Sequence, residues 1–264
     1  MMSMRESRRC LVGCVFAVLL VGMLAFGFAP RAFADESLGK CGDNLVASID
    51  GGHGKLTIAK ASSKKSDGSM YDYSEKATPW NAYSSEIVTL VVRPGVTTLT
   101  AGSFEGMGNL KNVYLPNSLK SVKSTAFGET DSLSDVYWGG SKSAWDKFKG
   151  NISTTGNAML LSATVHCLQP ARPSITKPKA GKKSVTVKWK AQQENVSGFQ
   201  VQYSLKKSFK SAKKKTVNNA SATSKKIKKL KSKKKYYVRV RAFNKTEVGT
   251  LYSSWSKAKK VKAK

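Results

Sequence analysis

The chain has 264 residues, with 46 Lys and Arg against 16 Asp and Glu, and a formal net charge of +30 at neutral pH. Apolar residues make up 40% of it, which excludes a disordered polymer of low hydrophobicity. The length suits one or two domains, each able to bury its own core. Two histidines and four cysteines disfavour a His-rich metal site and a dense disulfide scaffold. The high net charge favours a polyanionic partner.

Residues 1–34 have the features of a secretory signal peptide. Arginines precede an uncharged apolar run over residues 10–28, and Ala32 and Ala34 supply the small residues of a cleavage site. We therefore expect cleavage after Ala34 and a secreted, extracellular protein with no transmembrane segment in the mature chain. A retained membrane anchor is the alternative, because the apolar run is almost long enough to span a bilayer.

Two cysteines, Cys41 and Cys167, remain after cleavage. They lie near opposite ends of residues 35–168, whereas a disulfide requires Cα atoms within about 7 Å. The sequence leaves open whether these two thiols pair.

Two consecutive segments, residues 96–118 and 119–141, repeat one apolar pattern with an offset of 23 residues. The matched pairs are Val96 and Leu119, Leu99 and Val122, Phe104 and Phe127, Leu110 and Leu133, Val113 and Val136, and Tyr114 and Tyr137. Residues 87–92 look like an earlier, partial copy. The period lies in the range of leucine-rich repeats, about 20 to 29 residues. It predicts one short strand per repeat and a core made by stacking neighbouring repeats.

Alternate residues of each predicted strand should face the core. The residues expected to point inward are Leu110, Val113, Leu115, Leu133, Val136 and Trp138. Phe104 and Phe127 are expected to fill the core from the return legs, the segments that lead from one strand of the stack to the next. Tyr114 and Tyr137 occupy equivalent positions that point out of the stack. Two interpretations stay open for this pair: an exposed aromatic ladder that binds a sugar or a partner's pocket, or rings that only cover the strands and pack together.

Several short motifs in residues 41–167 carry a family resemblance. They are the L-x-x-V-x-L-P-x-S-L line from Leu110 to Val122, the Ala126-Phe127 pair, the opening Cys41-Gly42-Asp43-Asn44-Leu45, and Gly139-Gly140-Ser141 followed by Trp145. Together they resemble a BspA-type leucine-rich repeat domain, a bacterial family of secreted and surface proteins. The resemblance implies a short repeat solenoid with N- and C-terminal caps over residues 35–168 and a surface or adhesion role. About three repeats are present, fewer than the long arrays that relatives can carry.

The composition changes at Gln169, where several prolines mark a linker and an entry strand. Four alternating segments follow, at residues 184–189, 199–203, 224–230 and 236–242, and this spacing predicts an all-β sandwich. Trp189 and the pair Leu230 and Tyr236, six residues apart, resemble a fibronectin type III domain over residues 169–264. That immunoglobulin-like family implies a corner in which the tyrosine hydroxyl bonds backbone near the leucine. The expected fold class is mainly β: a short leucine-rich repeat solenoid followed by a fibronectin type III β-sandwich.

The charge is unevenly divided along the chain. Residues 1–34 carry +3, residues 35–168 carry no net charge, and residues 169–264 carry +27, with 29 basic residues and two acidic ones. Nearly all of these basic residues are lysines, which favour diffuse attraction to polyanions over readout of bases. The candidate binding residues are Lys213, Lys214, Lys215, Lys233, Lys234 and Lys235. The alternative is a solvated face without a specific ligand.

No arrangement of catalytic, cofactor-binding or metal-ligating residues stands out in the sequence. His53 lies in a glycine-rich turn, and His166 beside Cys167 does not by itself make a base and a nucleophile. Arg239 and Arg241 are expected to stack on Trp255, which serves stability. We therefore expect a protein that is not an enzyme and takes no cofactor or metal.

Together these patterns predict a secreted or cell-surface binding or adhesion protein. Its repeat face would bind a protein, such as a host surface protein, or a glycan. Its sandwich would bind anionic cell-wall polymers or host glycosaminoglycans, with no specific nucleic-acid target. Two alternatives stay open: an accessory or spacer protein of an extracellular enzyme system, and an extracellular nucleic-acid binder.

Overall fold

The structure is a computed structural model that describes residues 35–192 and 194–264. The predicted signal peptide, residues 1–34 with cleavage after Ala34, lies outside the described residues. One hydrophobic core draws on residues 41–160 and a second on residues 175–263. Within the described ranges, no helix is long and apolar enough to cross a membrane.

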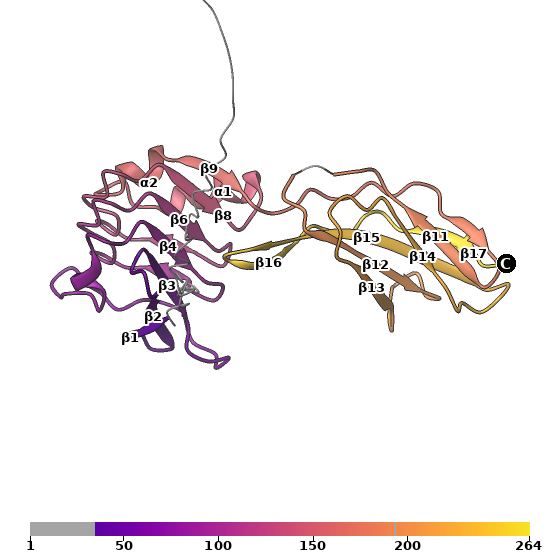
Figure 1. The fold of residues 1–264 in the computed structure, drawn as a ribbon, viewed down its shortest axis with the longest axis horizontal. Helices are drawn as coiled ribbons and strands as arrows, with labels where there is room; N and C mark the ends of the chain where they lie inside the picture. Colours follow the sequence, from indigo (N-terminus) through magenta and orange to yellow (C-terminus); the bar gives the residue numbers. More distant parts are fainter. Residues whose placement is uncertain (1–34, 193) are drawn as a thin grey trace, which may run out of the picture. The chain divides into compact units, whose positions relative to one another are not determined.

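The first core is built around a seven-stranded sheet with the strand order β1-β2-β3-β4-β6-β8-β9. Its strands are β1 (Glu36–Gly42), β2 (Leu45–Ile49), β3 (Lys55–Lys60), β4 (Thr89–Val92), β6 (Asn112–Leu115), β8 (Asp135–Trp138) and β9 (Thr164–Cys167). The first three strands are antiparallel, and every pairing from β3 to β9 is parallel. Figure 1 shows these parallel strands following one another in chain order. Two further short strands, β5 (Thr98–Leu99) and β7 (Ser121–Val122), pair in parallel on the return legs.

The 23-residue spacing of the sequence is a structural repeat. Leu90 in β4 pairs with Val113 in β6, which pairs in turn with Val136 in β8. All the residues predicted to point inward, and both return-leg phenylalanines, are at most 3% exposed. Phe104 lies between Phe127 and Trp80, with ring centroids 5.2 and 5.7 Å away. The prediction of one strand per repeat with alternate residues buried is confirmed.

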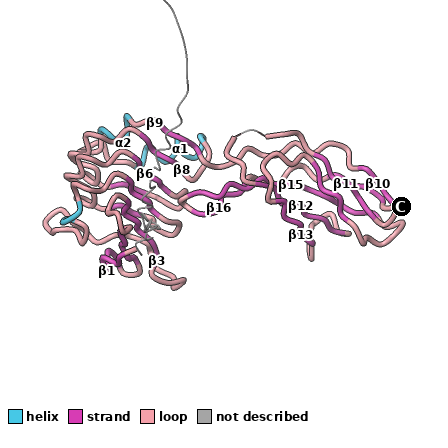
Figure 2. Tube along the Cα trace, in the orientation of Figure 1, coloured by secondary structure: helices cyan, strands magenta, loops and turns pink. Residues whose placement is uncertain are grey.

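Helical structure in the described residues is limited to short segments (Figure 2). These are η1 (Asn81–Tyr83), between β3 and β4, and α1 (Lys142–Phe148), η2 (Lys149–Asn151) and α2 (Ala158–Ser162), between β8 and β9. The helix α1 begins directly after the Gly-Gly-Ser segment, because Ser141 Oγ accepts a hydrogen bond of 3.2 Å from the backbone N–H of Ala144. Trp145 and Phe148 of this helix pack against Trp138 of β8.

A buried asparagine forms hydrogen bonds with the backbone of the return leg that follows β7. Asn157 is fully buried, and its Oδ1 accepts a hydrogen bond of 2.9 Å from the N–H of Phe127. Its Nδ2 donates to the carbonyl oxygens of Lys123 and Ser153 at 2.8 and 2.9 Å. Buried backbone groups need such partners because they cannot reach water. Asn157 therefore supplies hydrogen bonds that regular strand pairing does not provide here.

The two cysteines among the described residues do not form a disulfide. Cys41 lies in β1 and Cys167 in β9, the two edge strands of the seven-stranded sheet. Neighbouring strands lie about 4.8 Å apart, so six steps separate these edges by roughly 29 Å, far beyond the reach of an S–S bond. The pairing that the sequence left open is thus corrected to two free thiols. Burial raises the pKa of the Cys41 thiol to about 12, and it also raises the pKa of Cys167.

The second core lies between the two sheets of a β-sandwich. One sheet consists of β10 (Lys179–Gly181), β11 (Ser184–Lys188) and β14 (Ser224–Ile227), and the other of β12 (Gly198–Ser204), β13 (Lys213–Val217), β15 (Lys235–Thr246), β16 (Gly249–Tyr252) and β17 (Lys259–Lys262). Val187 of β11, Val201 of β12 and Val240 of β15 are fully buried, as their alternation with polar residues predicts. All four predicted strands are present, although their ends differ from the prediction.

The largest difference concerns the segment predicted as one strand over residues 224–230. The strand β14 ends at Ile227, because the backbone turns at Lys229, which has a φ of 58°. Leu230 then packs into the core, and the hydroxyl of Tyr236 accepts a hydrogen bond of 3.0 Å from the N–H of Lys231. This is the tyrosine corner that the sequence predicts.

Candidate binding surfaces

The outward side of the parallel strands carries a stack of three rings. Tyr114 of β6 and Tyr137 of β8 have ring centroids 4.4 Å apart and planes inclined by 10°. His166 of β9 continues the stack, with its ring 4.8 Å from that of Tyr137. All three side chains stay partly exposed. The tyrosines therefore point outward as predicted and also pack against each other, so the structure combines features of both interpretations.

The histidine joins this stack because of strand register. It pairs directly with Tyr137 across β8 and β9, although it lies 29 residues further along the chain and not 23. The helices α1 and α2 take up the additional residues. Sequence periodicity alone therefore misses His166, and only the continued register of the parallel sheet identifies it.

A carboxylate lies beside these rings. His166 Nε2 and Asp135 Oδ1 are 2.7 Å apart, and Ser134 Oγ donates a hydrogen bond of 2.7 Å to Asp135 Oδ2. These hydrogen bonds, first the one with His166, hold the pKa of Asp135 below its usual value. Burial raises the pKa of Tyr114, so its hydroxyl stays neutral. Because the ring faces pack against one another, this surface offers ring edges and hydroxyl groups to a ligand, with a hydrogen-bond acceptor beside them.

The lowered pKa of Asp135 predicts an acid-dependent stability. A carboxylate with a depressed pKa in the folded state stabilises that state above its unfolded pKa, about 3.9, and loses this effect as the pH falls through the lower folded value. We expect Asp135→Asn to unfold at a lower temperature than the wild type near neutral pH. The deficit should shrink once the pH drops below about 4. Thermal unfolding followed by circular dichroism across this pH range measures the difference in unfolding temperature. A difference that stays the same in strong acid would contradict a stabilising role of the ionised Asp135 carboxylate.

The two arginines of β15 are enclosed by aromatic rings. The guanidinium carbon of Arg239 lies 4.0 Å from the ring centroid of Phe209 and 4.8 Å from that of Trp255, and Arg241 lies 4.6 Å from Trp255. Gln202 of β12 accepts a hydrogen bond of 2.6 Å from Arg239 Nε. The predicted stacking on Trp255 is confirmed. Because these arginines are partnered within the sheet, they contribute to its stability more than to ligand binding.

The predicted lysines are all exposed but do not form one cluster. Lys213, Lys214 and Lys215 lie on β13, an edge strand of the five-stranded sheet, whereas Lys233, Lys234 and Lys235 lie in the turn before β15 and at its start. Lys235 is directly opposite Lys262 across β15 and β17. Like charges placed opposite each other in this way are destabilising. The pairing of β15 with β17 therefore keeps these two positive charges side by side.

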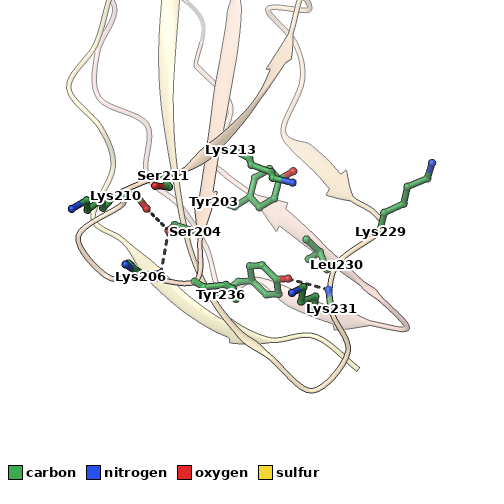
Figure 3. A pocket seen from close by; sticks show the side chains of 11 residues that line it. Tyr203, Ser204, Lys206, Lys210, Ser211, Lys213, Lys229, Leu230, Lys231 and Tyr236 are labelled. Carbon is green, nitrogen blue, oxygen red and sulfur yellow. Dashed lines mark hydrogen bonds between the residues drawn. The ribbon is translucent and has the colours of Figure 1, made fainter.

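The sandwich also contains a cavity of about 360 Å³ that the sequence does not predict. Figure 3 shows it between the loop that follows β12 and the tyrosine corner. Of the six predicted lysines only Lys213 lines it, and four others join it: Lys206, Lys210, Lys229 and Lys231. The runs of lysine in the sequence indicate where positive charge is concentrated, but only the folded chain shows which lysines line the same cavity.

The remaining histidine has the structural surroundings expected of it. His53 has a φ of 55°, and its Nδ1 lies 2.9 Å from Glu86 Oε2. Its ring also packs against Tyr83 at 4.7 Å. Within residues 35–192 and 194–264, no group of three or more His, Cys, Asp or Glu residues is placed to hold a metal ion.

Comparisons with known proteins were made for the whole chain. No curated protein sequence matches it. Among solved structures, the FN1–FN3 domains of chicken CNTN1 are 22% identical, with a TM-score of 0.32, over 39% of this chain and 34% of that one. A myokine is 23% identical, with a TM-score of 0.30, over 36% and 98%. A leucine-rich repeat protein from Eubacterium ventriosum is 23% identical, with a TM-score of 0.35, over 40% and 26%.

The chain thus spans about a third of the CNTN1 fragment and a quarter of the Eubacterium protein. The family match is more definite: residues 168–259 match the Fibronectin type III domain. These residues contain the strands β10 to β16 of the two sheets and the corner formed by Leu230 and Tyr236. Together, the match and the geometry identify the C-terminal part of this chain as a fibronectin type III β-sandwich.

Proposed function

We propose that this protein is a secreted or cell-surface binding protein without catalytic activity, and that its basic sandwich attaches it to anionic polymers. The polymers would be anionic cell-wall polymers or host glycosaminoglycans. The observation that carries the proposal is the absence of internal counterions: residues 169–264 hold 29 basic and two acidic residues. Among the described residues, no lysine of this sandwich takes part in an ion pair.

Uncompensated lysines favour anion binding for a physical reason. Each exposed ammonium group is repelled by its neighbours, as Lys235 and Lys262 illustrate across one strand pair. A polyanion relieves this repulsion and releases its own condensed counterions, which makes binding strongly dependent on salt. Arginine is better suited to bidentate readout of bases, and two of the three arginines of the sandwich, Arg239 and Arg241, are stacked on aromatic rings. This distribution favours a polyanion that is recognised by its charge, and disfavours a nucleic acid that is recognised by its base sequence.

The repeat face is the second binding surface in the proposal. The stack formed by Tyr114, Tyr137 and His166, with Asp135 beside it, supports contact with a protein or a glycan. Ring edges, tyrosine hydroxyls and an adjacent acceptor are suited to the hydroxyl groups of a glycan or to a partner side chain. The resemblance to BspA-type repeats supports the surface or adhesion role.

Two charge-matched variants test the polyanion proposal. In the first, the six predicted lysines of the sandwich, Lys213–Lys215 and Lys233–Lys235, are replaced by glutamine. In the second, six exposed lysines of the repeat part are replaced instead: Lys64, Lys65, Lys76, Lys111, Lys120 and Lys123. Both lower the net charge equally, so only the position of the charge differs.

We expect the sandwich variant to bind heparin and isolated wall polymer about tenfold or more weakly at low salt, and the repeat variant to bind nearly as the wild type does. Salt-gradient elution and retention on cells measure this. Equal losses in both variants, or retention that high salt leaves unchanged, would overturn the proposal. Duplex DNA that binds more tightly than heparin would favour the nucleic-acid alternative.

A further inference from the structure

The cavity next to the tyrosine corner combines two kinds of surface. Five lysines line it, from the loop after β12, from β13 and from the corner segment, and Figure 3 shows the side chain of Lys229 extending away from the other lining residues. Its floor is made by Tyr203, Leu230 and Tyr236, which belong to the sandwich core, and Leu205, half exposed, also lines it. A volume of about 360 Å³ falls at the lower end of the range for small-molecule sites, about 300 to 1,000 Å³.

The backbone that carries these lysines is held by specific hydrogen bonds (Figure 3). The N–H of Lys206 donates to Ser204 Oγ at 3.0 Å, and Ser204 Oγ donates to the carbonyl oxygen of Lys210 at 3.4 Å. On the other side, the N–H of Lys231 donates to the hydroxyl of Tyr236. Lys213 is set by strand pairing directly opposite Tyr203. These lysines are therefore attached to structured backbone on both sides of the cavity.

Among the described residues, no carboxylate pairs with the lysines of this cavity. No carboxylate lines it, and neither acidic residue of residues 169–264, Glu194 or Glu247, is among its lining residues. Burial raises the pKa of Tyr203, so its phenol stays neutral and can donate a hydrogen bond. The site thus offers cationic groups and a phenol around a partly apolar floor.

We propose that this cavity binds one sulfated or carboxylated sugar unit of the anionic polymer. A pyranose ring has an apolar face that suits the tyrosine and leucine floor, and its anionic substituents suit the lysines. A simple phosphate chain would satisfy the lysines but would leave the floor uncovered. The proposal rests on the proposed function and adds to it a defined subsite, in which one sugar unit is bound more specifically than elsewhere on the surface.

The test uses the purified protein and isothermal titration calorimetry at low salt with three probes. These are a heparin-derived tetrasaccharide, inorganic tripolyphosphate, which has no ring face, and a hexaglutamate peptide. The pocket variant Lys213→Gln/Lys231→Gln is compared with Lys214→Gln/Lys215→Gln, which removes the same charge from exposed residues outside the cavity lining. Leu205→Ser removes an apolar contact without changing charge, and Tyr71→Ser, at an exposed site in the repeat part, is its control.

We expect the pocket variant to weaken tetrasaccharide binding about tenfold and the matched lysine variant about twofold. Leu205→Ser should weaken the tetrasaccharide about threefold and leave tripolyphosphate unchanged, while Tyr71→Ser affects neither. Equal losses in both lysine variants, with no effect of Leu205→Ser, would overturn the subsite and leave the proposed function standing. If hexaglutamate bound more tightly than the tetrasaccharide and lost affinity in the pocket variant, the ligand of the cavity would be an acidic peptide and not a sugar. Wild-type protein that binds none of the three probes would overturn both proposals.

Discussion

Phe104→Ala is expected to destabilise the repeat part by about 3 to 5 kcal/mol. The ring is fully buried between Trp80 and Phe127, so its removal loses transfer free energy and leaves a cavity in a row of stacked aromatics. Repeats stabilise one another through nearest-neighbour contacts, so the loss affects the units on both sides. Urea denaturation followed by tryptophan fluorescence measures the change.

The control for this variant is Tyr71→Ala. Tyr71 is an aromatic residue of the same part of the chain but is 41% exposed. Surface substitutions of this kind usually change stability by no more than about 0.5 kcal/mol. A similar loss in both variants would show that the aromatic row of the return legs does not hold the repeats together.

Asn157→Ala is expected to cost about 3 to 5 kcal/mol as well. The N–H of Phe127 would be left buried without a partner, at about 1 to 3 kcal/mol, and the two bonds donated to Lys123 and Ser153 would add about 1 kcal/mol each. The measurement is again urea denaturation, here with hydrogen exchange of the Phe127 amide as a local readout. That amide should exchange faster in the variant.

Asn109→Ala provides the matched comparison. Asn109 also donates its side-chain amide to a carbonyl oxygen, that of Ser85 at 2.7 Å, but the bond is exposed to solvent. Water can replace the lost partner there, so we expect a loss below about 1 kcal/mol. If the two asparagine variants lost equal stability, burial would not be the reason for the importance of Asn157.

Much of the fold can be predicted from sequence because its signals are local and periodic. The 23-residue offset predicts the pairing of Val113 with Val136, and alternation within strands predicts which side chains are buried. The resemblance of Leu230 and Tyr236 to the corner of a fibronectin type III domain implies a hydrogen bond that is present at 3.0 Å. In each case the residues that determine the element lie close together in the chain.

The parts that could not be predicted depend on charged or isolated residues. The strand β13 consists mostly of exposed lysines, so it lacks the apolar alternation by which strands are recognised. Asn157 belongs to no motif, and its importance follows from complete burial and from partners up to 34 residues away. His166 enters the aromatic stack only because helices between β8 and β9 return the chain to the same register.

The position of the charge and the repeating segments follow directly from the order of the residues, because net charge is a sum over residues and periodicity is a local property. Nearly all of the positive charge lies in residues 169–264. That Lys206, Lys213 and Lys231 line one cavity, and that the two cysteines lie in opposite edge strands of a sheet, is seen only in the folded chain. The physical reason is that such neighbourhoods arise from strand pairing and turns between residues distant in the chain, which composition and periodicity do not encode.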